Sequence, residues 1–237
     1  MAAIIVCHLT RMKPGFICVA GVERETGQAT RPMPPGKFLS RTSLCRYGGA
    51  FDIASVVELG FIRDVGCAPE VEDRHFWLPE AERLEEMAPD AFWNLLQQNA
   101  KARLTEIFGP DLLPVQGGMA VDLQKGRISL GFFRPAAPPA LYIDSLGKVR
   151  LEVTEGRRKL RLPVTDLRLY RADQQTPRQD LLAPINLRMR RGVPVILGVG
   201  LTRPWSKEDA EVKRHWLQVN NLHLQDNPVW TDRSLPF

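Results

Sequence analysis

The sequence lacks the features that would place the protein in a membrane or outside the cell. No run of about 18 apolar residues occurs among its 237 residues, so a transmembrane helix is not expected. Residues 1–9 have neither the charged start nor the cleavage site of a signal peptide, and are more typical of a β-strand. These absences predict a cytoplasmic protein without a membrane partner.

Cysteine is also scarce, and its spacing argues against a metal or disulfide framework. The four cysteines form no C-x-x-C pair, and the four histidines do not complete a closely spaced set of zinc ligands. Disulfide frameworks are typical of small secreted chains. We therefore expect no metal and no cofactor, and free thiols at Cys7, Cys18, Cys45 and Cys67.

Motifs of the common enzyme classes are missing as well. There is no G-x-S-x-G, H-E-x-x-H or P-loop sequence, and the pair Gly198 and Gly200 lacks the third glycine of a dinucleotide-binding loop. The chain is therefore predicted not to be an enzyme, although an active site assembled from distant positions would leave no such motif.

What the sequence does have is an uneven distribution of charge around a net value of +5. Residues 1–63 carry 8 Lys/Arg against 4 Asp/Glu, whereas residues 64–111 carry 4 against 11. Residues 112–138 carry 3 against 1, and residues 139–237 carry 17 against 11. An anionic partner would be attracted to the two basic ends and repelled by the acidic middle; charge alone leaves an ordinary solvated surface as the alternative.

The first half of the chain shows strand patterns and then a change to helical spacing. Strands are expected over residues 3–9, 16–22, 28–32 and 51–62, and one helical turn over residues 40–46. Residues 79–87 and 89–108 predict two helices, and the apolar stripe of the second is a packing face. The two helices form an acidic helical insert at about residues 79–109.

The second half returns to strand patterns. Strands are expected at residues 128–133, 141–143, 149–154, 159–162, 165–170, 193–201 and 216–224. A helix is expected over residues 179–191, with Gly192 as the residue that ends it. Three prolines at positions 135, 138 and 139 predict a boundary between one unit of residues 1–138 and another of residues 139–237.

Each half thus combines short strands with a helix placed between later strands. This arrangement is typical of the OB fold, a five-stranded, partly open Greek-key barrel. The predicted fold class is mostly β with inserted helices (α+β), built as two OB-like Greek-key barrels in tandem.

Short blocks along the chain resemble a known family. They lie at residues 7–32, 51–58, 163–170, 198–204 and 215–223, and the first includes C-H-L-T, G-F-I-C-V-A-G-V-E and T-G-Q-A-T-R-P. In order and composition they resemble the dual OB-containing domain family of bacterial and archaeal proteins. The resemblance implies two OB units and a nucleic-acid-binding role in a prokaryotic conflict or defence system. Ala29 departs from the pattern, which has an aromatic residue there, so a possible stacking surface is missing.

Three groups of residues are candidate nucleic-acid contacts, and the first is Arg31 at a strand end. Arg31 would bind a phosphate or a base, or else pair with a carboxylate such as Glu23 across the hairpin. The second group is a basic hairpin over residues 148–161, here called the basic ribbon. It would follow a sugar–phosphate backbone, or protect an edge strand against aggregation. Its cations are Lys148, Arg150, Arg157, Arg158, Lys159 and Arg161.

The third group combines cations, aromatic rings and amides, as proteins that bind single strands do. If Leu217 and Val219 point into the core, Trp216 shares an outer face with Gln218 and Asn220. If Trp216 itself belongs to the core, the group largely disappears. Its members are Arg203, Trp205, Arg214, His215, Trp216, Gln218 and Asn220.

These features lead to one main hypothesis and two alternatives. The main hypothesis is an accessory protein that binds single-stranded DNA or RNA, because OB grooves take unstacked bases. One alternative is an adaptor that docks other proteins of a multi-subunit defence complex through its acidic insert. The other is a sensor of a nucleotide or a modified base in a barrel mouth.

Overall fold

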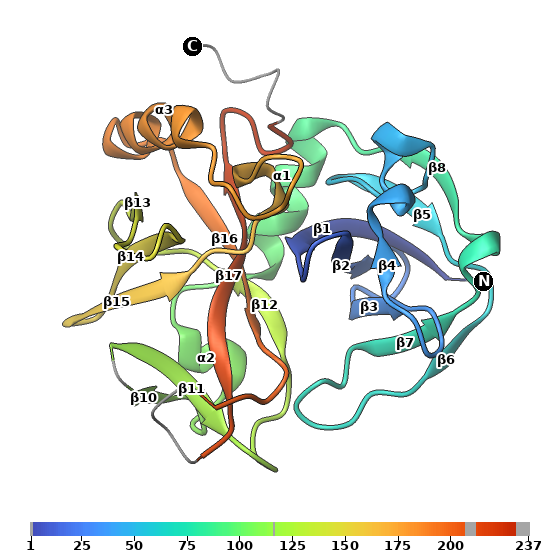
Figure 1. The fold of residues 1–237 in the computed structure, drawn as a ribbon, viewed down its shortest axis with the longest axis horizontal. Helices are drawn as coiled ribbons and strands as arrows, with labels where there is room; N and C mark the ends of the chain where they lie inside the picture. Colours follow the sequence, from blue (N-terminus) through green and yellow to red (C-terminus); the bar gives the residue numbers. More distant parts are fainter. Residues whose placement is uncertain (1, 116, 207–211, 231–237) are drawn as a thin grey trace.

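The computed structural model describes residues 2–115, 117–206 and 212–230, and within these residues the protein is mostly β. The strands form three sheets, and the helices lie between and beside them (Figure 1). The predicted class, mostly β with inserted helices, is confirmed at this level. Among the described residues, no helix is both long and apolar enough to cross a bilayer.

The N-terminal sheet has the strand order β6-β7-β3-β2-β1-β5-β8, with β4 paired to β2. Its central strands are rich in Ile, Val and Ala, and most of their residues are buried. The sheet therefore curves around an apolar core of its own. Its strands are β1 (Ala3–Arg11), β2 (Phe16–Glu23), β3 (Ala29–Met33), β4 (Leu39–Ser40), β5 (Ser55–Glu58), β6 (Ile62–Asp64), β7 (Asp73–Phe76) and β8 (Glu82–Glu86).

Two further sheets enclose a second core. A six-stranded sheet has the order β10-β11-β17-β16-β12-β9, and a three-stranded sheet has the order β13-β14-β15. The six-stranded sheet takes strands from both sides of residue 138, the boundary expected from the sequence. The strands are β9 (Ala100–Lys101), β10 (Leu113–Val115), β11 (Gly118–Asp122), β12 (Leu130–Phe133), β13 (Ala140–Ile143), β14 (Val149–Glu155), β15 (Arg158–Pro163), β16 (Val195–Leu201) and β17 (Arg214–Leu224).

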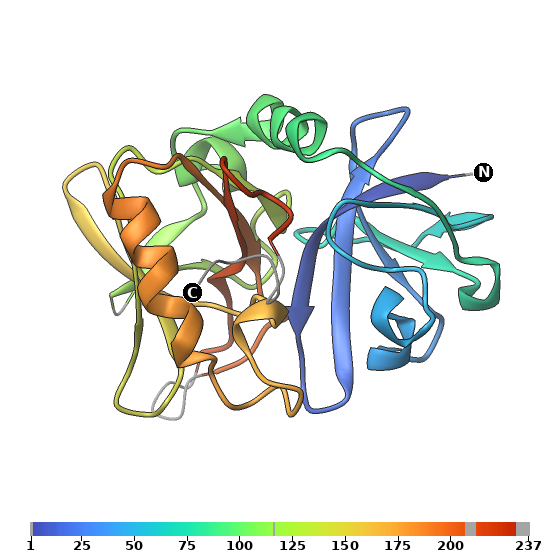
Figure 2. The same ribbon diagram turned by 90° about the horizontal axis from the view of Figure 1, so that it is seen from above.

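Helices connect and cover these sheets. α1 (Pro89–Asn99) buries Phe92 and Leu96 in the N-terminal core, and Figure 2 shows it on the path from the N-terminal sheet to the others. α2 (Leu104–Phe108) and α3 (Gln179–Arg190) bury their apolar faces in the second core. Gly192 follows α3 at φ +88°, the left-handed conformation expected of the residue that ends a helix.

Two of the helices predicted from the sequence differ from the structure. Residues 79–87 form a single turn, Leu78–Glu80, followed by the exposed strand β8. Pairing of β8 with β5 outweighs the helix propensity of its Glu, Leu and Arg residues. The helix expected over residues 89–108 ends at Asn99, because Ala100 and Lys101 pair in parallel with β12 before α2 begins.

Two predicted strands also differ from the structure. The long strand expected over residues 51–62 is divided: Ser55–Glu58 forms β5, Ile62 already belongs to β6, and Ala54 takes a left-handed conformation (φ +65°) before β5 begins. Residues 165–170 contain a short helical turn, Leu167–Leu169, in which the Asp166 carboxylate accepts a hydrogen bond from the backbone N–H of Arg168. The single turn expected over residues 40–46 is present as two short 3₁₀ turns.

Candidate functional site

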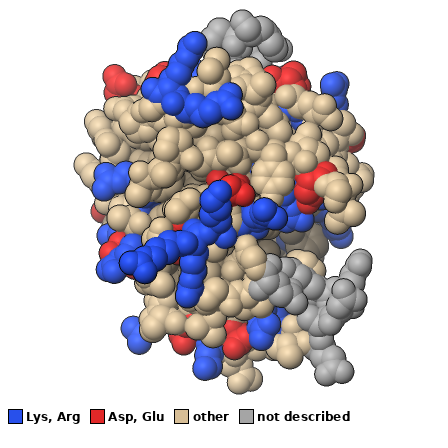
Figure 3. Space-filling view, turned by 90° about the vertical axis from the view of Figure 1, so that its left-hand side faces the viewer, with Lys and Arg blue, Asp and Glu red and all other residues tan. Residues whose placement is uncertain are grey.

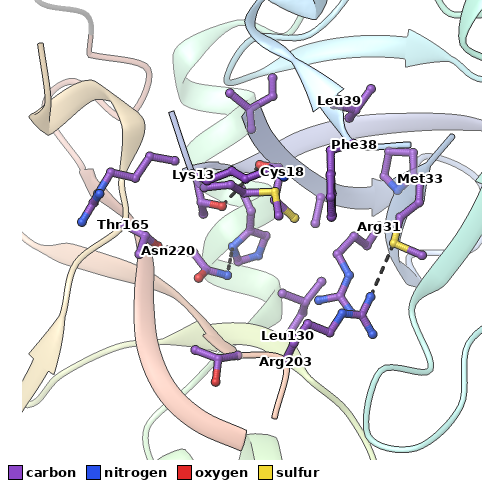
Figure 4. Close-up of a pocket in the computed structure, with 18 of the residues that line it drawn as sticks. Lys13, Cys18, Arg31, Met33, Phe38, Leu39, Leu130, Thr165, Arg203 and Asn220 are labelled. Atoms are coloured by element: carbon purple, nitrogen blue, oxygen red, sulfur yellow. Dashed lines mark hydrogen bonds between the residues drawn. The ribbon is translucent and has the colours of Figure 1, made fainter. Parts of the chain in front are cut away.

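A pocket of about 860 Å³ lies where the N-terminal sheet meets the six-stranded sheet. One wall comes from β1, β2, β3 and the segment between β3 and β4, and the other from β16, β17 and the segment after β16. Figure 4 shows Thr165 and Asn220 on one side of this inter-sheet pocket, with Arg31 and Met33 on the other. The pocket is therefore assembled from segments far apart in the sequence.

Side-chain hydrogen bonds hold the two sheets together behind the pocket. The Asn221 amide oxygen accepts the backbone N–H of Leu9 at 2.7 Å, and its amide nitrogen donates to the Leu9 carbonyl at 3.3 Å. The His223 ring nitrogen Nε2 lies 3.1 Å from the Cys7 carbonyl oxygen. These contacts join β1 to β17 and so fix the two walls relative to each other.

Two glycines of β16 make room for polar side chains in the pocket. A Cβ at Gly198 would lie 2.8 Å from the His8 ring, and a Cβ at Gly200 would lie 2.5 Å from the Asn220 amide nitrogen. Both distances are shorter than real Cβ contacts allow, so a side chain at either position would displace the polar groups. The G-x-G sequence thus allows side chains of β1 and β17 to pack closely against the backbone of β16.

His8, Asn220 and Gln218 form a short polar network that lines the pocket. Gln218 donates to the Asn220 amide oxygen at 2.9 Å, and the Asn220 amide nitrogen lies 3.4 Å from His8 Nδ1. The His8 ring is stacked on Phe132 with centroids 4.9 Å apart. Burial, with smaller effects of His223 and Arg31, lowers the pKa of His8 to about 3, so the ring is neutral at pH 7.

Arg31 and Arg203, one from each wall, share one carboxylate. Arg31 donates from Nε to Asp73 Oδ1 at 2.5 Å, and Arg203 donates from Nη2 to the other oxygen, Oδ2. Arg31 and Asp73 are buried, whereas the Arg203 side chain is 55% exposed. Arg31 thus does pair with a carboxylate, but with Asp73 of β7 rather than with Glu23.

Two more carboxylates support the walls from behind, and sequence reasoning did not single them out. Glu72 is buried and accepts hydrogen bonds from the backbone N–H groups of Ser129 and Leu130 and from the Ser129 hydroxyl. Glu70 lies 3.3 Å from His215 Nδ1 and 3.5 Å from Arg203 Nη1. The acidic middle of the sequence therefore supplies buried contacts between the sheets, a role that charge counting does not indicate.

The lining of the pocket is cationic and partly aromatic. Within the described residues, five Lys/Arg side chains line it and no Asp or Glu does; the five are Arg11, Lys13, Arg31, Lys37 and Arg203. Two aromatic rings of the lining are about half exposed, Phe38 (54%) and Trp205 (45%). The Lys13 ammonium lies 5.1 Å from the centroid of the Phe38 ring, a cation–π distance.

The structure divides the third predicted group of contact residues. Arg203, Trp205, Gln218 and Asn220 line the inter-sheet pocket. Trp216 and His215 are buried, and the Trp216 indole N–H donates to the Trp205 carbonyl at 3.0 Å. Their inclusion among exposed contacts is corrected by the burial pattern of β17, in which both faces are covered.

The remaining member of that group and the basic ribbon do not line the pocket. Arg214 is held by Asp122 at 2.6 Å. The ribbon consists of β14, β15 and the turn between them, and it points away from the N-terminal sheet (Figure 1). Arg150 pairs with Asp144, while Lys159 and Arg161 both lie near Glu152. Lys148, Arg157 and Arg158 are exposed.

Figure 3 views the side of the molecule on which the ribbon projects, and Lys and Arg side chains form a band across this face.

Within the part of the chain that the structure describes, no group of three or more His, Cys, Asp or Glu side chains could hold a metal ion. The four cysteines are unpaired thiols.

Comparisons with known proteins add little to this geometry. No family model matches the chain, and no curated protein matches it. Among solved structures, it is similar to the crystal structure of the p204 HINb domain, with 10% sequence identity and a TM-score of 0.36 over 94% of each chain. A TM-score of 0.36 carries no argument about fold or function, and membership of the dual OB-containing family stays a prediction.

Proposed function

We propose that this protein binds single-stranded nucleic acid in the inter-sheet pocket. The observation that carries the proposal is the lining itself, in which, among the residues that the structure describes, five Lys/Arg side chains occur without a carboxylate. Positive side chains in a concave surface attract phosphates, and this attraction is the main source of nucleic-acid affinity.

The other lining residues favour unstacked bases over a duplex. Phe38 and Trp205 offer half-exposed rings for stacking, and the amide of the half-buried Gln218, which buried Asn220 holds in place, can hydrogen-bond a base edge. A duplex presents neither its base faces nor its Watson–Crick edges to such a pocket. On this proposal the curved sheets act as two OB-like barrels, and the role in a conflict or defence system rests on the sequence resemblance alone.

The proposal is tested by fluorescence anisotropy with labelled single-stranded DNA, single-stranded RNA and duplex DNA at several salt concentrations. We expect single strands to bind more tightly, with affinity falling linearly on a log–log salt plot. The double variant Lys13→Glu, Lys37→Glu should weaken single-strand binding by at least about tenfold. The matched control reverses two exposed lysines outside the pocket, Lys101 and Lys125. Absence of binding at low salt, or equal losses in both variants, would reject the pocket as the binding site.

A second function, docking of a basic partner protein, is favoured by a different observation. Trp77 and Leu84 are exposed in the acidic middle of the sequence, residues 64–111, in which β8 also carries exposed Glu side chains. Deleting this segment would not be a fair test, because Asp73 and Phe92 are buried within it. The variants Trp77→Ser and Leu84→Ser should abolish co-purification with the products of neighbouring genes while nucleic-acid binding persists. Retained complexes would count against docking.

A further inference from the structure

The wall of the inter-sheet pocket contains a buried cation with an unused hydrogen-bond donor. The Arg31 side chain is only 8% exposed, and its Nε is occupied by Asp73. Its Nη2 atom is enclosed and has no hydrogen-bond partner among the described residues. Because a buried charged donor without an acceptor is costly, such a group commonly marks the position of a missing ligand or water.

Arg203 brings a second guanidinium to the same place. Its Nη2 binds the other oxygen of Asp73, so one carboxylate positions both arginines, and Figure 4 shows the two guanidinium groups close together beside Met33. More than half of the Arg203 side chain is exposed, so it remains accessible to a ligand. Formally, Glu70 and Asp73 balance the charge of the two guanidinium groups, but neither carboxylate lines the pocket. Planar guanidinium groups suit the bidentate recognition of phosphate.

The volume of the pocket limits the size of the molecule that could bring a phosphate to these two guanidinium groups. A volume of about 860 Å³ is in the range of sites that enclose one small organic molecule. A site of this size has room for one nucleotide rather than for several. Asn220 lies across the pocket from Arg31 (Figure 4), and its amide holds the half-buried Gln218, which can meet the base of the same nucleotide.

We propose that the pocket recognises the end of a strand: one terminal nucleotide whose phosphomonoester binds Arg31 and Arg203. This inference rests on the proposed function and names the part of the nucleic acid that enters the site. A terminal phosphate suits the site better than an internal phosphodiester, because it carries up to two charges and three free oxygens. A free nucleoside monophosphate has the same chemistry, so the test must separate the two sources.

The experiment compares oligonucleotides of one sequence in the full chain. They are a linear strand with a 5′-phosphate, one with a 3′-phosphate, one with hydroxyl groups at both ends, and a circular strand. One of the phosphorylated strands should bind at least about tenfold more tightly than the hydroxyl-ended and circular strands. Nucleoside 5′- and 3′-monophosphates are added as competitors.

Variants identify the residues responsible for this difference. Arg203→Gln should reduce the preference for a terminal phosphate to about twofold or less, and Arg203→Lys, which keeps the charge but loses the fork, should restore it only in part. Arg31→Gln is expected to do the same, but it also removes the buried partner of Asp73; Arg203, being exposed, carries the test if that variant does not fold. Lys125→Gln is the matched control.

The outcomes separate this inference from the proposed function. Equal binding of circular and phosphorylated linear strands would overturn end recognition and leave single-strand binding intact. Binding of a nucleoside monophosphate alone, lost in Arg203→Gln, would support the phosphate site and overturn strand binding. If neither strands nor mononucleotides bind, both proposals fail.

Discussion

The protein presents two cationic regions that differ in how the sequence encodes them. The basic ribbon places six Lys/Arg within residues 148–161, whereas the inter-sheet pocket takes five from positions between Arg11 and Arg203. The ribbon contains no aromatic residue, is exposed, and has carboxylates among its cations. The pocket has aromatic rings in its lining, and none of the described lining residues is a carboxylate. Charge density along a sequence is therefore a poor guide to the charge density that a ligand meets.

The comparison is tested most strongly by measuring stability. In the pocket, Arg31 is buried against Asp73, whereas the charges of the ribbon are mostly exposed. Asp73→Ala would leave Arg31 buried without its partner, so we expect the free energy of unfolding to fall by about 3–5 kcal/mol in urea denaturation. Glu152→Ala, which removes the carboxylate that Lys159 and Arg161 approach in the ribbon, should cost less than about 1 kcal/mol. Similar costs for the two would remove this distinction.

Part of the pH dependence of stability should also originate at the pocket, where His8 lies; burial lowers the pKa of His223, outside the pocket, in the same way. The folded pKa of His8, about 3, lies below its unfolded value of about 6.5, so the unfolded chain binds the proton first. The resulting stability is complete above pH 6.5 and is lost as the pH falls toward 3, at up to about 1.4 kcal/mol per pH unit. His8→Gln should reduce the slope of unfolding free energy against pH between 6.5 and 4.5. An unchanged slope would show that His8 does not contribute.

A smaller effect is expected from the aromatic rim. Trp205→Ala should weaken single-strand binding by about 1–2 kcal/mol, because it removes one stacking ring from the pocket. Trp77→Ala removes another exposed ring that does not line the pocket, and anisotropy titration should show no change in affinity for it. Equal losses would indicate nonspecific stacking on exposed rings.

The smallest effect is predicted for the ribbon itself. Charge reversal of Arg157, Arg158 and Lys159 together should lower affinity less than about threefold at 0.15 M salt, since these exposed charges are screened beyond about 8 Å. A loss larger than that of Lys13→Glu, Lys37→Glu would make the ribbon the main contact and reverse the comparison.

Local features of the fold could be predicted from the sequence, because they depend on neighbouring residues. The ribbon hairpin, with Gly156 at φ +58°, and the end of α3 at Gly192 follow directly from turn chemistry. β8 could not be predicted in this way. Its five residues suit a helix, and only pairing with β5 makes them a strand.

The candidate site could be predicted from the sequence only in part. Arg31, Arg203, Gln218 and Asn220 were candidates because of their chemical type, and the structure places all four at one pocket. Nothing in their spacing shows that Arg31 and Arg203 meet at Asp73, since the three residues come together only when the sheets pack. Burial of Trp216 likewise depends on the layer that covers β17.

The bonds between β1 and β17 have a consequence for biosynthesis. Leu9 leaves the ribosome long before Asn221, the residue 212 positions later that binds both of its backbone groups. Contacts between such distant residues form slowly because a long loop must close first. The N-terminal sheet therefore lacks its β17 partner, and one wall of the pocket is uncovered, until Asn221 has been synthesised and has left the ribosome. A ligand can therefore bind the complete pocket only after β17 has been synthesised.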